Sequence, residues 1–177
     1  VEDYISQVMA FDYGDLADSG AGTGSLNYET QAANNGPAHK IISGLKIGAT
    51  VDPEIDGNQS ALATGDDSSN TGSVDDEDGA TLPMFIAGET ATIPVVVMNM
   101  TGSDAKLTMF MDFNNDGDFN DLGEMTSTTV PTGTNGSVNL TLAVPDNAVI
   151  NTNLGVRFRL SNDFTSAMSA TGVSSSG

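Results

Sequence analysis

The side chains most capable of chemistry lie in one run, Asp112-Phe-Asn114-Asn-Asp116-Gly117-Asp118-Phe-Asn-Asp121-Leu-Gly-Glu124. Oxygen-bearing side chains stand at alternate positions around Gly117, and a glycine permits the sharp turn that lets a short loop wrap around one ion. Calcium is a hard cation that takes about six to eight oxygen ligands. The run therefore predicts a calcium site with the ligands Asp112, Asn114, Asp116, Asp118, Asp121 and Glu124, where Asp118 or its neighbour can also use a backbone oxygen.

The beginning of this run matches the calcium loop of an EF-hand. Asp112, Asn114, Asp116, Gly117 and Asp118 fall at loop positions 1, 3, 5, 6 and 7. The end differs, because the glutamate falls at position 13 where an EF-hand has it at 12. The flanking residues read as strands, so an EF-hand helix pair is not expected. The alternative to a calcium loop is an acidic hairpin that is simply solvated.

A second acidic stretch spans residues 52–78, and a third spans residues 12–18. Adjacent carboxylates repel one another, and the chain has 5 Lys and Arg against 24 Asp and Glu. We therefore expect one or more further cations here, with a solvated charge run as the alternative. Spacing does not tell which carboxylates would touch metal. The candidate ligands are Asp52, Glu54, Asp56, Asp66, Asp67, Asp75, Asp76, Glu77 and Asp78, together with Asp12 and Asp15.

The formal charge of −19 excludes two classes of partner. A nucleic-acid binder needs a basic surface, and an anionic membrane surface repels an acidic chain. No apolar run approaches the roughly 20 residues needed to cross a bilayer, so no membrane insertion is expected. The chain is 38% hydrophobic, with many of those residues alternating in strand-like runs. This pattern favours a folded domain over disorder.

Catalysis is not expected. The chain has no cysteine, and His39 is its only histidine, so neither a catalytic thiol nor a usual zinc site can form; a structural role for His39 is favoured. Paired carboxylates can hydrolyse glycosides. Because the chain has 24 acidic residues, some pair of carboxylates is expected by chance and does not indicate a glycosidase. The chain also has no tryptophan and only three tyrosines to form an aromatic platform for a sugar.

The second half of the chain alternates as strands do. Within 105–113, 137–144 and 155–160, every second residue is apolar and the intervening residues are mostly polar, which predicts that Arg157 and Arg159 face outward. The run 90–98 is more continuously apolar and predicts a strand covered on both sides, although Pro94 argues for an edge or a bulge. The predicted fold is an all-β antiparallel sandwich with long acidic calcium-binding loops. The residues predicted to face inward are Leu107, Met109, Met111, Phe113, Val138, Leu140, Leu142, Val144, Val156, Phe158 and Leu160.

Several short motifs follow one another along nearly the whole chain. They are Asp12-Tyr-Gly-Asp15 with Asp18-Ser19, Ala38-His39-Lys-Ile, Val51-Asp-Pro-Glu-Ile-Asp-Gly57, Ala63-Thr-Gly-Asp-Asp67, Asp75-Asp-Glu-Asp-Gly79, the 112–118 loop with Gly123-Glu124, and Val156-Arg-Phe-Arg-Leu-Ser161. In this order they resemble the GEVED domain family. The resemblance implies a large secreted or cell-surface bacterial protein, often with tandem β-rich modules, and no established catalytic activity.

The motif that names the family, Gly-Glu-Val-Glu-Asp, is displaced. It normally lies at the C-terminal end of the domain, whereas here Val1-Glu2-Asp3-Tyr4 carries most of it. We therefore expect the chain to be one period of a tandem array cut in a shifted frame. Residues 1–10 would be the terminal strand of the preceding repeat, or a strand donated to a neighbour, and residues 11–177 would form a single module.

The leading functional hypothesis is a calcium-stabilised structural repeat of an extracellular adhesin or filament. Adjacent copies would assemble head-to-tail, with residues 1–9 packing as a strand on the next copy. In the alternative, this segment folds back and completes its own sheet. A second hypothesis is a calcium-dependent module that binds surface glycans or proteins, and a weaker third is a non-catalytic appendage of a secreted hydrolase.

Overall fold

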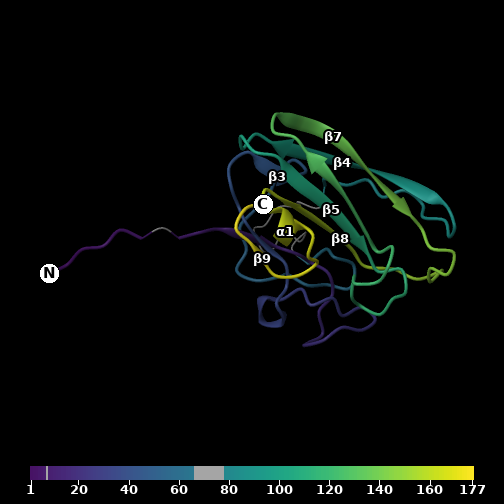
Figure 1. Ribbon diagram of the computed structural model, residues 1–177. Helices are drawn as coiled ribbons and strands as arrows, with labels where there is room; N and C mark the ends of the chain where they lie inside the picture. The colour runs from purple at the N-terminus through teal and green to yellow at the C-terminus, as the bar shows by residue number, and fades with distance from the viewer. Residues whose placement is uncertain (7, 66–77) are drawn as a thin grey trace.

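Strands dominate the computed structural model, which describes residues 1–6, 8–65 and 78–177 (Figure 1). The predicted all-β class is confirmed. The strands are β1 (Phe11–Tyr13), β2 (Ala38–Lys40), β3 (Leu45–Ile47), β4 (Thr90–Asn99), β5 (Ala105–Met111), β6 (Met125–Val130), β7 (Thr134–Ala143), β8 (Val156–Ser161) and β9 (Val173–Ser174). The helical elements of the described residues are a 3₁₀ turn, η1 (Ala32–Asn34), and a one-turn helix, α1 (Phe164–Ala167).

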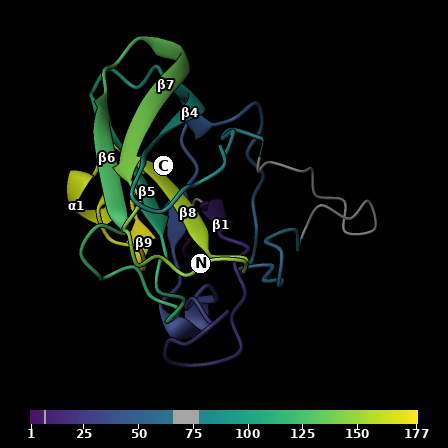
Figure 2. The ribbon, with the colours of Figure 1, turned by 90° about the vertical axis from the view of Figure 1, so that its right-hand side faces the viewer.

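The described strands form three sheets, with the orders β3-β4-β7, β6-β5-β8 and β1-β2-β9. All pairings are antiparallel except β2 with β9. The two larger sheets share one core and form the sandwich. β6 and β7 follow each other through a short turn and lie side by side (Figure 2), and the Thr126 hydroxyl donates to the Thr141 carbonyl at 2.7 Å. This side of the sandwich is therefore closed.

The core lies between the two larger sheets because their strands place apolar residues on one face at a period of two. In β4, Ile93, Val95 and Val97 are at most 1% exposed, while Pro94 and Val96 between them are exposed. The predicted inward face of β7 is confirmed by Leu140 and Leu142. β5 differs, because Thr108 and Phe110 on its second face are buried as well. A further layer must therefore cover the outer face of the β6-β5-β8 sheet.

Two expectations for β4 are wrong. Residues 90–98 are covered on one face only, since burial alternates along the strand. The strand is also central rather than at an edge, and Pro94 pairs in register with Asn139 of β7. A proline is tolerated here because β4 bonds on its other side to an irregular segment, where Thr81 donates to the Pro94 carbonyl at 3.1 Å. The missing N–H of Pro94 points toward this segment and not into the β7 ladder.

The expectation that Arg157 and Arg159 face solvent is also wrong, because these side chains are 5% and 1% exposed. Both guanidinium groups donate to backbone carbonyls. Arg159 bonds the carbonyls of Ser169, Thr171 and Gly172 at 2.7–2.8 Å. Arg157 bonds those of Ala170 and Tyr28 at 2.7 and 3.1 Å. Segments far apart in sequence thus form the third layer over β8.

His39 of β2 belongs to this buried layer, in the structural role expected for it. Its Nε2 accepts a hydrogen bond of 2.7 Å from Nε of Arg159, which requires a neutral imidazole. Burial and the positive charge of Arg159 together lower the pKa of His39 to about 3, against hydrogen bonds to the backbone of Leu160 and Ser176, which raise it. The histidine therefore accepts from Arg159 at neutral pH.

The N-terminal segment runs away from the body of the molecule (Figure 1). Its described residues are exposed and form no strand, including Tyr4, Ile5 and Val8, which are 84–104% exposed. It leaves the body at Ala10, whose carbonyl accepts from Ile41 N at 3.0 Å. Whether the segment packs on a neighbouring copy stays a prediction. None of the helices in the described ranges has the length and apolar character that crossing a bilayer requires.

The alternation along β4 predicts different costs for two neighbouring valines. Val95 is fully buried and Val96 is 47% exposed. Val95→Ala removes two buried methyl groups and should lower the free energy of unfolding by about 2 kcal/mol. Val96→Ala should cost less than about 1 kcal/mol. Denaturant unfolding at fixed calcium concentration measures both, and equal losses would contradict the assignment of the two faces.

The buried histidine predicts a pH dependence. Because the folded-state pKa of His39 is about 3 and the unfolded value is about 6.5, the unfolded state binds more protons as the pH falls below 6.5. Stability is therefore lost on acidification, by about 2 kcal/mol between pH 6.5 and pH 5. His39→Gln keeps an acceptor for Arg159 and should remove this part of the pH slope. Parallel slopes in the parent and the variant would show that His39 does not titrate on unfolding.

Candidate metal centre

The acidic run 112–124 is the connection between β5 and β6, and the two strands fix its ends. Phe110 pairs with Met125 in the ladder, and Met111 N donates to the Glu124 carbonyl at 2.8 Å. On the other side, Asp112 N donates to the Gly155 carbonyl at 3.1 Å, next to the start of β8. The loop is therefore clamped between both neighbours of β5.

Asp112 and Glu124 fold the loop on itself. The Asp112 carboxylate is fully buried and accepts from the amides of Asp116 at 3.2 Å and Gly117 at 3.0 Å. The Glu124 carboxylate, 2% exposed, accepts from the amides of Phe113 at 2.8 Å and Asp121 at 3.3 Å. Burial raises the pKa of Glu124, and the nearby charge of Asp112 adds to it, against these two hydrogen bonds.

Gly117 is required at the turn of the loop. Its φ is +85°, a conformation that residues with a side chain rarely adopt, and a Cβ there would lie 1.9 Å from the carbonyl oxygen of Gly24. The neighbouring Asn115 also has a positive φ, and its side-chain oxygen accepts from the Ser25 hydroxyl at 3.1 Å. The loop thus packs against the N-terminal loop, which adds to the clamp from the strands.

Three carboxylates converge at the exposed end of the loop. An oxygen of each of Asp116, Asp118 and Asp121 lies within 4.8 Å of the others. The Asn114 amide donates to Asp116 at 2.9 Å and also to Asp121. Three carboxylates at this separation repel one another unless a cation lies between them. Asp116 and Asp121 are exposed and Asp118 is half-buried, so solvent can supply further ligands. This all-oxygen donor set fits a hard cation.

Phe119 holds the loop against the body of the molecule through its buried ring. The sequence-based prediction did not include this residue. Its ring is 6% exposed and stacks on Tyr28, with centroids 5.5 Å apart. It also lies 5.9 Å from the ring of Phe110 and 5.3 Å from the guanidinium carbon of Arg157. The signal available in the sequence was an aromatic residue placed between the acidic positions of an otherwise polar loop.

Tyr28 joins this aromatic cluster to the start of β8. Its hydroxyl accepts from Gly155 N at 2.9 Å, close to the buried carboxylate of Asp112. Burial is the main cause that raises the pKa of Tyr28 to about 12. The negative charge of Asp112 and a hydrogen bond to its carboxylate act in the same direction. The tyrosine is therefore a neutral structural group at physiological pH.

The other predicted ligands that the structure describes are spread over the N-terminal loops. Glu54 accepts from Tyr13 N at 2.9 Å and from the Asn58 amide at 2.6 Å. Asp56 accepts from the amides of Ala32 and Gly57 at 2.6 and 2.8 Å. Each of these carboxylates tethers a loop segment.

Four further predicted ligands lie apart from the converging loop. Asp78 accepts from Ala49 N at 2.9 Å. Asp12 is half-buried on β1, Asp15 is buried and Asp52 is half-buried. Over the described ranges, the acids that come together as a group of three are Asp116, Asp118 and Asp121. The predicted ligands Asp66, Asp67, Asp75, Asp76 and Glu77 lie outside the described residues.

Asp18 is a structural carboxylate that was not among the predicted ligands. It is 4% exposed and accepts from the amides of Thr30 and Gln31 at 2.8 Å and from the Asn34 side chain at 2.7 Å. Burial raises its pKa, but the hydrogen bonds from Asn34 and the backbone outweigh burial and lower the pKa overall. Asp18 thus holds together the loop residues between Asp18 and Asn34.

Comparison with known proteins gives a family match for the C-terminal part of the chain. Searches among curated proteins and among solved structures gave no match. The family model of the GEVED domain matches residues 106–177, a segment that contains the converging loop and β8. The resemblance expected from the sequence motifs is confirmed over this segment.

Proposed function

We propose that the chain is a calcium-stabilised structural repeat of an extracellular or cell-surface bacterial adhesin or filament, without catalytic activity. The observation that carries the proposal is the convergence of Asp116, Asp118 and Asp121 in a loop clamped at both ends. Asn114 lies beside them, bonded to two of the three carboxylates. Calcium supplies the positive charge that this chain otherwise lacks.

In this proposal the buried carboxylates of Asp112 and Glu124 shape the loop. Asp112 and Glu124 bond to four amides of the loop and hold its backbone in the shape that brings the outer acids together. They would complete the coordination of the ion where an oxygen lone pair remains available. The ion would link the two ends of the β5–β6 connection and reduce repulsion across a chain with 24 acidic residues.

The proposed extracellular location rests on general chemistry together with the family match. Calcium sites of extracellular modules have dissociation constants of about 10⁻⁴–10⁻³ M, which suits a calcium-rich exterior. A bound ion can stabilise a secreted domain that has no cysteine for a disulfide. The family match covers residues 106–177, and the tandem arrangement that the resemblance implies supports assembly through copies of the chain.

A cavity beside the metal loop favours a second candidate, a calcium-dependent glycan- or protein-binding module. This cavity, of about 400 Å³, shares Asp118 and Asp121 with the loop and is also lined by Tyr28, Glu29 and Phe110. Hydroxyl groups of a ligand could reach an ion held there. This candidate requires ligand binding that chelator abolishes, whereas the structural repeat requires only that calcium stabilises the fold.

The proposed site predicts a calcium-dependent melting temperature. An ion that binds only the folded state at about 100 times its Kd adds about 2.7 kcal/mol of stability, or roughly 5–10 °C in Tm for a domain of this size. The double variant Asp116→Asn with Asp118→Asn should lose most of this shift. Isothermal titration calorimetry should show at least one fewer bound calcium in the variant than in the parent.

A charge-matched variant controls for the simple loss of negative charge. Glu89→Gln with Asp146→Asn removes two exposed acids outside the loop and should keep the stoichiometry and the calcium shift of the parent. The ionic strength is held equal in calcium and in chelator. Equal melting of the parent in both solutions, or equal stoichiometry in all three proteins, would refute calcium binding at the loop.

A further inference from the structure

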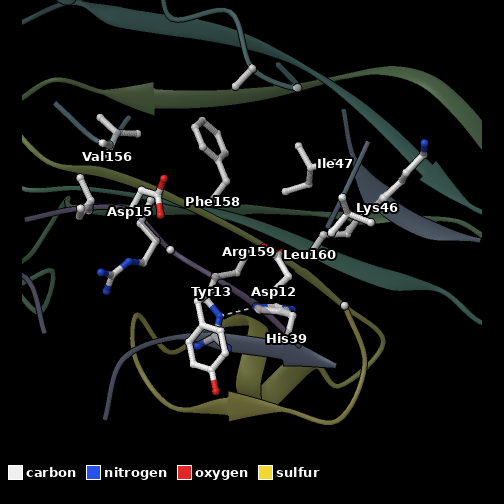
Figure 3. Close-up of a pocket in the computed structure, with 18 of the residues that line it drawn as sticks. Asp12, Tyr13, Asp15, His39, Lys46, Ile47, Val156, Phe158, Arg159 and Leu160 are labelled. Carbon is white, nitrogen blue, oxygen red and sulfur yellow. Dashed lines mark hydrogen bonds between the residues drawn. The ribbon is translucent and has the colours of Figure 1, made fainter. Parts of the chain in front are cut away.

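The sandwich is open on the side opposite β6 and β7. A cavity of about 360 Å³ lies between β8, the last strand of one large sheet, and β3, the last strand of the other. Val156 and Phe158 of β8 and Ile47 of β3 point into the same space above β8 (Figure 3). These residues are half-buried and pack against the core. The cavity is thus a lateral entrance to the hydrophobic core.

The backbone of β8 presents an unpaired edge to this cavity. β8 pairs with β5 on one side only. Asp112 N donates to the Gly155 carbonyl, and antiparallel ladders alternate, so the backbone groups of Val156 and Phe158 point away from β5. Across the described ranges, these groups bond to no other segment. An edge of this kind is a template for one more strand.

The charged side chains that line the cavity have both signs. Lys46 is half-buried there, and Asp12 and Asp15 line it as well. The guanidinium groups of Arg157 and Arg159 bond to backbone carbonyls of the layer outside β8. Charge therefore does not select the occupant, and the half-buried apolar side chains of the lining favour an apolar strand.

The N-terminal segment has the properties that such an edge requires. Its described residues run away from the body of the molecule (Figure 1), and Val1, Tyr4, Ile5 and Val8 are at least 84% exposed, which leaves their apolar surface without cover. It carries two acids, Glu2 and Asp3. At about 3.3 Å per residue, nine residues span roughly 30 Å, which exceeds the length of β8. The segment is therefore long enough to pair with Val156 and Phe158 and to reach the cavity beside them.

We propose that the cavity between β8 and β3 is an acceptor groove, occupied by residues 1–9 of a second copy as an added strand along β8. This inference rests on the proposed function as a repeat and adds to it the surface that joins the copies. Backbone hydrogen bonds to Val156 and Phe158 hold the strand, and its apolar side chains pack against Ile47 and Phe158. Donor and acceptor are different surfaces, so the contact propagates head-to-tail.

A binding experiment with a defined probe tests the groove. The probe is a fluorescent synthetic peptide of residues 1–9, and the acceptor is the full chain with Ile5→Asp and Val8→Asp, which disable its own donor segment. Saturable binding by anisotropy is expected, and a peptide that carries the same two substitutions should not bind. Thr50 is exposed and lines the cavity, so adding Thr50→Trp to the acceptor should weaken peptide binding at least tenfold by blocking the entrance.

Adding Met84→Trp instead provides the matched control, because Met84 is 85% exposed and does not line the cavity; it should leave binding unchanged. In sedimentation equilibrium, the parent mass should rise with concentration, and that of the Ile5→Asp, Val8→Asp chain should not. Absence of peptide binding at millimolar concentration, binding insensitive to Thr50→Trp, or a parent that stays monomeric because its segment fills its own groove would each overturn the proposal. Parallel melting in calcium and chelator tests the calcium-stabilised repeat separately.

Discussion

Repulsion among carboxylates is the physical constraint on which the rest of this structure depends. The chain has 24 Asp and Glu but only 5 Lys and Arg, so ion pairs cannot neutralise most of its negative charge. Many described acids instead accept hydrogen bonds from backbone amides, as Asp18, Asp56, Asp112 and Glu124 do. Such bonds stabilise the charged form of a carboxylate and at the same time order a loop. The loops of this protein therefore depend on the acids that they carry.

The few cationic side chains have a different task. Arg157 and Arg159 bond to backbone carbonyls between β8 and the segments that cover it. Burial lowers the pKa of Arg157 to about 9 and that of Arg159 to about 10, so both groups remain charged at neutral pH. They join the third layer to the sandwich, and within the described ranges they do not pair with the exposed acids of the 112–124 loop. A bound cation would reduce the repulsion among Asp116, Asp118 and Asp121, and this is the basis of the proposed function.

Local patterns predicted the sandwich but not the layer outside it. The inward face of β7 followed from a period of two, because its opposite face meets only solvent. In β8 the same pattern correctly placed the apolar residues on one face and the arginines on the other. It wrongly predicted that the arginine face meets solvent. The layer that covers them consists of β1, β2, β9 and residues 169–172, which are short pieces without periodicity of their own. For the site, spacing indicated the loop itself. The roles of Phe119 and Tyr28 depend on contacts between distant segments, which spacing does not encode.

The central claim is that a cation binds among the three converging carboxylates. A crystal structure of the chain grown in calcium, with anomalous diffraction data collected at long wavelength, tests this claim most directly. The account predicts an anomalous difference peak within bonding distance of oxygens of Asp116, Asp118 and Asp121, at about 2.3–2.6 Å. A well-ordered 112–124 loop without a peak between these carboxylates, at a calcium concentration that stabilises the fold, would contradict it.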